Sequence, residues 1–173
     1  MTLKDKLLYS IMIFVVLGFV FGSWNIAYAE AEDSTAYYDL FYQEPADVYL
    51  GKGGVFMVSS SYNATATINR FVHNNTYPSE DLEFYDRWID FAIYDYNANP
   101  YLGLWGFNYV YFNLKYHTRA LWEEGELSIY RWDTTRKDWI ECPTFLVEMK
   151  NVPHGRSTCI MTSFGLYGLA VEK

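Results

Sequence analysis

Short apolar runs separated by turn residues fill the chain from Ala36 onwards, and no long segment keeps a helical period. The clearest run is 109–116, where Val110, Phe112, Leu114 and Tyr116 fall on one face and the intervening residues on the other. This period of two is typical of a half-buried strand. The runs predict strands at 37–42, 55–60, 65–72, 88–94, 109–116, 127–132, 138–142, 145–149, 157–163 and 166–172. We therefore expect an all-β fold, a sandwich or barrel, and take the antiparallel β-sandwich as the prediction.

Turn residues agree with these limits. The segment 133–137 predicts a hairpin tip between the strand that ends at Trp132 and the strand that starts at Asp138. The segment 79–90 is ambiguous, because the spacing of its apolar residues also suits a short amphipathic helix. That helix stays open as an alternative.

The first residues have the pattern of an export signal. Two lysines precede an uncharged apolar stretch at 7–20, and Ala27-Tyr28-Ala29 offers the small-x-small pattern that signal peptidase recognises. Cleavage would fall before Glu30. The predicted organisation is then a signal peptide or anchor helix at 1–29, an acidic linker at 30–36 and the β-sandwich domain at 37–173.

An uncleaved membrane anchor is the alternative. Residues 7–24 form an apolar stretch of about 18 residues, which is at the lower limit for a helix that spans a bilayer. Lys4 and Lys6 remain on the cytoplasmic side in either case. The domain is therefore expected outside the cytoplasm, secreted, periplasmic or extracellular, with membrane contact through 7–24 if the signal is retained.

Composition narrows the classes of partner. With 173 residues and 51% hydrophobic content, the chain has material for one domain with a core. A net charge of −8 and the absence of a basic run argue against a nucleic-acid partner. Aromatic residues make up 20% of the chain, which favours strands and supplies rings for a core or an interface.

The only two cysteines are Cys142 and Cys159. An even pair in an exported chain indicates a disulfide, which would close a loop of about 18 residues and stabilise the fold by about 3 kcal/mol. Two cysteines and three scattered histidines do not supply the ligands of a zinc site. We expect no metal and no cofactor.

Two sequons and a group of acidic residues complete the candidate sites. Asn63 and Asn74 stand in glycosylation sequons near predicted strand ends. A hydrolase would need two positioned carboxylates, and acids do gather between residues 81 and 95, but their spacing does not pair them. We interpret them as solvated residues and predict that the chain is not an enzyme.

The C-terminal half resembles a known family. Residues 125–133 read Gly-Glu-Leu-Ser-Ile-Tyr-Arg-Trp-Asp, residues 138–140 read Asp-Trp-Ile, and residues 162–169 read Thr-Ser-Phe-Gly-Leu-Tyr-Gly-Leu. These segments are similar to the closing strands of GAIN-like β-sandwich domains and of the related sandwich in ankyrins and netrin receptors. The likeness covers roughly 88–173 and is most specific after Gly125.

The same resemblance implies a module without self-cleavage. Self-cleaving members of the family use a histidine to activate a hydroxyl that attacks the preceding peptide bond. The matching positions here are Ser163, Phe164 and Gly165, so both the base and the nucleophile are missing.

Two functions remain open at this stage. The first is a structural or interaction module, an accessory subunit that binds a protein partner in a surface or membrane assembly. The second is a carbohydrate-binding module that stacks exposed rings on sugars. Tyr101, Trp105 and Trp122 are the candidate rings, for stacking or for an interface, because they lie beside glycines or at predicted loop ends.

Overall fold

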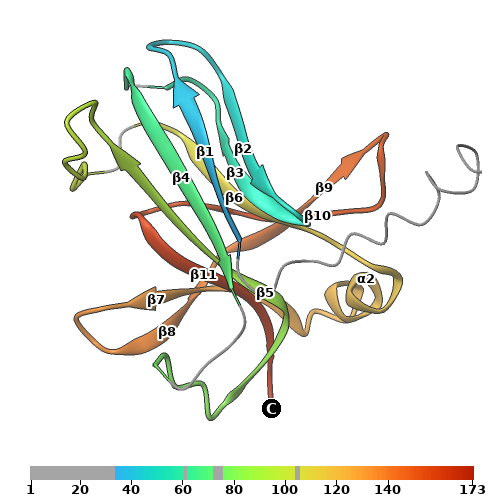
Figure 1. The fold of residues 1–173 in the computed structure, drawn as a ribbon. Helices are drawn as coiled ribbons and strands as arrows, with labels where there is room; N and C mark the ends of the chain where they lie inside the picture. The colour runs from blue at the N-terminus through green and yellow to red at the C-terminus, as the bar shows by residue number, and fades with distance from the viewer. Residues whose placement is uncertain (1–33, 61, 72–75, 104–105) are drawn as a thin grey trace, which may run out of the picture. The chain divides into compact units, whose positions relative to one another are not determined.

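The computed structural model describes residues 34–60, 62–71, 76–103 and 106–173 (Figure 1). They belong to one compact unit that spans Glu32–Lys173. The predicted signal or anchor at 1–29, with Ala27, Ala29 and Glu30, lies outside the described residues, as do Asn74 and Trp105.

The described chain is mostly β. Its strands are β1 (Ser34–Leu40), β2 (Ala46–Leu50), β3 (Gly53–Met57), β4 (Ala64–Phe71), β5 (Leu82–Tyr94), β6 (Asn108–Asn113), β7 (Leu127–Asp133), β8 (Asp138–Cys142), β9 (Thr144–Met149), β10 (Val152–Ile160) and β11 (Gly165–Glu172). The helix α2 (Tyr116–Glu123) lies between β6 and β7 in the chain (Figure 1).

The strands form two antiparallel sheets. One has six strands in the order β1-β4-β5-β11-β7-β8, and the other has five in the order β2-β3-β6-β10-β9. The predicted hairpin tip is confirmed, because Asp133 at the end of β7 pairs with Asp138 at the start of β8 (Figure 1).

One hydrophobic cluster takes side chains from both sheets. Ile68, Phe91 and Tyr167 come from the six-stranded sheet and are fully buried. Val55 and Phe112 enter the same cluster from the five-stranded sheet. The two sheets therefore share a core.

Val110 and Phe112 are buried in this core, as the alternation predicted for 109–116 requires, and Tyr109 is not. The rest of that prediction is corrected, because Tyr111 is also buried, the strand ends at Asn113, and Tyr116 is exposed at the start of α2.

Four other features of the fold also differ from the sequence-based expectation. The segment 79–90 is not a helix, because its residues from Leu82 onwards belong to the long strand β5. Strand β2 was not predicted, and β1 begins at Ser34, within the predicted linker. Helix α2 was also not predicted, because eight residues are too few for a helical pattern of apolar positions to be recognised.

A bulge in β5 reshapes the outer side of the six-stranded sheet. Tyr85 pairs with Leu169 and Ile89 pairs with Tyr167, so β5 has two more residues in this interval than β11. Asp86 takes a positive φ of 63° there. The bulge brings Phe84 and Trp88 over Gly168, where an added Cβ would lie 2.4 Å from the ring of Phe84. Only glycine fits beneath these two rings.

The rings above Gly168 belong to a second cluster. Trp88 and Trp139 are buried in it with ring centres 5.1 Å apart, and Trp132 lies 5.5 Å from Trp139. Tyr77 covers this cluster, with its ring centre 5.3 Å from that of Trp132. Much of the aromatic content of the chain is thus used for packing.

Candidate functional site

The outer side of the five-stranded sheet is apolar. Five residues on this side form what we call the apolar face: Phe56, Tyr109, Phe145, Val147 and Met149. They line a hollow of about 370 Å³ together with Asp47, Tyr111, Arg156 and Thr158. Phe145 and Met149 are 39% and 41% exposed. Large apolar side chains therefore stand in solvent on one continuous surface.

Strand register explains why these residues meet. Tyr109 of β6 pairs with Phe56 of β3 on one side and with Ile160 of β10 on the other. One row further, Thr158 of β10 lies between Tyr111 and Phe145. Side chains in such rows project to the same side of the sheet, so four strands contribute to one surface.

An antiparallel sheet with one face on the core normally carries polar residues on the other face. Here β6 places Val110 and Phe112 in the core and Tyr109 and Tyr111 on the outer side. The rings of Tyr109 and Phe145 meet edge to face at 6.1 Å between centres. The outer side of this sheet is therefore largely apolar at the hollow, with polar groups at one end of it.

The polar groups at one end of the hollow satisfy each other. The Tyr111 hydroxyl donates a hydrogen bond of 2.6 Å to Asp47 Oδ1. The Arg156 guanidinium lies 3.8 Å from the centre of the Tyr111 ring, and its Nη1 is 3.7 Å from Asp47 Oδ2. Burial and the hydrogen bond to Asp47 raise the pKa of Tyr111. One positive and one negative charge are paired, so this end of the hollow has no excess charge.

Two of the rings predicted for stacking, Tyr101 and Trp122, do not line this hollow. Tyr101 is half-buried against the common core and meets the ring of Tyr62 at 4.8 Å. Trp122 in α2 also packs against that core, with the guanidinium of Arg119 5.6 Å from its ring centre. Both rings thus contribute to packing.

The two cysteines lie together inside the common core. Cys142 is the last residue of β8 in the six-stranded sheet, and Cys159 is in β10 of the five-stranded sheet. Both are buried free thiols, and the Cys159 thiol donates to the Ile160 carbonyl at 3.7 Å. The neighbouring Cys142 thiol and burial raise the pKa of Cys159. The disulfide stays a prediction, and the proximity of the thiols across the two sheets supports it.

The acidic residues of β5 and of the loop that follows it have different surroundings. Asp86 forms an ion pair with the buried Arg70, and Asp95 accepts hydrogen bonds from the loop that follows. Asn69 donates to Asp90, while burial raises the pKa of Asp90. Among the described residues no group of three or more histidine, cysteine or acidic side chains forms a candidate metal site.

Asp90→Asn is expected to stabilise the protein at pH 7 and to lose that advantage near pH 3. The pKa of Asp90 is raised above its ordinary value of 3.8, so the folded state holds this proton more tightly than the unfolded state. Stability therefore falls as pH rises from 3.8 through the raised pKa, and the amide removes this decline. Urea unfolding at both pH values measures the effect, with the exposed Glu83→Gln on the same strand as control. A variant less stable than wild type at pH 7 would contradict this reading of Asp90.

The remaining predicted residues are exposed or half-buried. Asn63 is exposed, and its Oδ1 accepts a hydrogen bond of 3.1 Å from the Tyr42 amide. His117 and His154 make ring contacts with Tyr85 and Tyr116 at 6.0 and 6.1 Å. Within the described part of the chain, no helix has the length and apolar character needed to cross a membrane.

Comparison of the chain with protein-family models, with curated proteins and with solved structures gives no match.

Proposed function

We propose that the chain from Ser34 onwards is a non-catalytic β-sandwich module that binds a protein partner through the apolar face. The observation that carries this proposal is the hollow on the outer side of the five-stranded sheet, where a polar surface would be expected. Contiguous exposed apolar surface of this kind marks interaction sites in soluble proteins.

The chemistry of the hollow and its lining supports a protein partner. Aromatic residues, methionine and arginine are the types enriched at protein interfaces, and all three are present here in Tyr109, Met149 and Arg156. Because Asp47 and Arg156 pair with each other, the hollow offers no unbalanced charge for an ionic ligand. The occupant that fits is a protein surface with a protruding aromatic or aliphatic side chain.

The extent of the face favours a protein over a small ligand. The apolar rows continue past the hollow to Ile160, which pairs with Tyr109 and is itself exposed. A ligand that filled only the hollow would leave this part of the surface in water. A partner surface covers both.

The export signal predicted from the sequence supports a location outside the cytoplasm, and retention of 7–24 would tether the module to a membrane as an accessory subunit. The resemblance to GAIN-like domains agrees with a module that has no catalytic role. At the matching site the Ser163 hydroxyl accepts a hydrogen bond of 2.7 Å from Arg131 Nη1, and Gly165 supplies no nucleophile.

Phe145→Ser with Met149→Ser is expected to abolish partner binding without unfolding the domain. Both residues are exposed on β9, an edge strand of its sheet, and exposed substitutions usually change stability by less than about 0.5 kcal/mol. The full tagged chain is produced in its own cells and crosslinked, and the protein recovered with it is quantified. We expect at least a tenfold loss for the double variant.

The matched control is Leu102→Ser, which removes an apolar side chain that is 96% exposed and does not line the hollow. It should retain the partner. Equal retention by the double variant would overturn the proposal. Recovery of a second copy of this chain alone, or binding to lipid vesicles alone, would replace the protein partner with another occupant and overturn it as well.

A further inference from the structure

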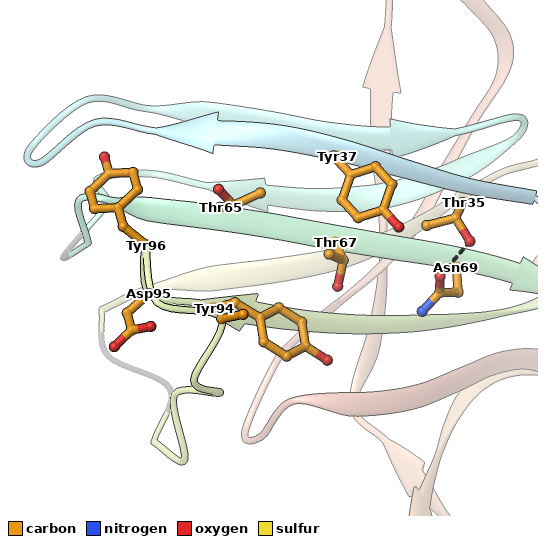
Figure 2. A pocket seen from close by; sticks show the side chains of 9 residues that line it. Thr35, Tyr37, Thr65, Thr67, Asn69, Tyr94, Asp95 and Tyr96 are labelled. Carbon is orange, nitrogen blue, oxygen red and sulfur yellow. Dashed lines mark hydrogen bonds between the residues drawn. The ribbon is translucent and has the colours of Figure 1, made fainter.

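A second hollow lies on the outer side of the other sheet. The tyrosine hollow has a volume of about 460 Å³ and is lined by Thr35, Tyr37, Thr65, Thr67, Asn69, Tyr94, Asp95, Tyr96 and Ala98. These residues come from β1, β4, β5 and the loop after β5 (Figure 2). The site therefore belongs to the six-stranded sheet and shares no residue with the apolar face.

Short side chains between rings create this hollow. In the strand register, Tyr37 on β1 pairs with Thr67 on β4, and Tyr94 on β5 pairs with Thr65 on β4. Figure 2 shows the two rings on either side of the β4 threonines. Tyr37 is 71% exposed. A ligand above β4 would meet ring surfaces at its sides and threonine side chains beneath it.

The third ring is held by an ordered loop. Asp95 Oδ1 accepts hydrogen bonds of 2.9 Å from the Asn97 amide and 2.8 Å from the Asn99 amide. The Asn99 side chain donates to Asp95 Oδ2 at 3.0 Å. These bonds fix the loop that carries Tyr96, whose ring is also 71% exposed. Because the loop is already ordered, binding would cost little conformational entropy at Tyr96.

Polar groups stand beside the rings. Thr35 Oγ1 donates a hydrogen bond of 2.7 Å to Asn69 Oδ1 (Figure 2). The Asn69 amide donates to Asp90. The Thr67 hydroxyl donates at 3.4 Å to the Ala92 carbonyl, and its lone pairs remain able to accept. Hydroxyl groups that both donate and accept are suited to the hydroxyls of a sugar.

We propose that the tyrosine hollow binds a neutral carbohydrate. Tyrosine rings offer flat apolar surfaces to the C–H faces of a sugar, and the threonine and asparagine side chains offer hydrogen bonds at its edges. Among the residues that the structure describes, no lysine, arginine or histidine lines the hollow, and the chain has a net charge of −8. An anionic glycan would therefore find no compensating cation in this lining. Neutral carbohydrates are the class that fits.

The test is binding of the full chain to an array of neutral hexose and N-acetylhexosamine oligosaccharides, with sialylated and sulfated glycans on the same array. We expect neutral oligosaccharides to bind and anionic ones not to bind. Titration calorimetry with the best neutral oligosaccharide then gives the affinity. Tyr37→Ala and Tyr96→Ala are each expected to weaken binding at least tenfold.

Two controls separate this site from the rest of the surface. Tyr116→Ala removes a ring that is exposed outside the hollow, and it should bind the glycan like wild type. Phe145→Ser with Met149→Ser should also bind normally, so failure here and failure of the protein-binding proposal are distinguishable. Absence of glycan binding, binding of anionic glycans only, or binding unaffected by Tyr37→Ala and Tyr96→Ala would each overturn the inference.

Discussion

Asp86→Asn is expected to lower the free energy of unfolding by about 3 kcal/mol, because it removes the carboxylate from a buried ion pair. Arg70 is only 4% exposed, and its Nη2 pairs with Asp86 Oδ1 at the bulge in β5. Asparagine tolerates the positive φ of Asp86 as aspartate does, so the variant changes charge without adding backbone strain. Urea unfolding followed by tryptophan fluorescence measures the loss.

A double variant separates charge burial from packing. Arg70→Met with Asp86→Asn removes both charges, so no guanidinium remains buried without its carboxylate. We expect the double variant to be more stable than Asp86→Asn alone. The exposed Glu83→Gln on the same strand should change stability little. An Asp86→Asn protein within about 0.5 kcal/mol of wild type would show that the pair contributes no more than a surface ion pair.

Oxidation of Cys142 and Cys159 is expected to stabilise the folded protein by about 3 kcal/mol, the value for closing a loop of about 18 residues. The two thiols lie in strands of different sheets, so the bond would also link the sheets directly. Oxidised glutathione serves as the oxidant, and two thiols lose two hydrogens as one disulfide forms.

Intact mass before and after reduction reports whether the bond has formed, and urea unfolding compares the oxidised and reduced proteins. Cys142→Ala is the control, since it cannot form the bond and should unfold alike with and without reductant. Thiols that stay free in protein recovered from an oxidising environment would show that the pair is a packing feature of the core.

Sequence patterns located most strands because short apolar runs bounded by turn residues are a local signal. They could not identify the apolar face, because β6 alternates between two apolar sides and the period does not tell which side is the core. Tyr109 and Phe145 became candidates only when the register placed them on the outer side of the same sheet.

The tyrosine hollow could not be predicted from the sequence for a different reason. Tyr37, Thr65 and Tyr94 are far apart along the chain and meet only through the pairing of β1, β4 and β5. Pairing of this kind is set by long-range contacts that a local pattern does not contain. Sequence reasoning chose Tyr101 and Trp122 instead, because neighbouring glycines and loop ends indicate exposure, and both rings pack against the core.

The most direct test of the proposed function is site-specific photocrosslinking in the producing cells. The photoreactive residue p-benzoylphenylalanine is placed at position 145 on the apolar face or at position 102 outside the hollow. The proposal predicts a crosslink to one discrete protein from position 145 and none to that protein from position 102. No crosslink from position 145, or the same products from both positions, would contradict the proposal that this face binds a partner.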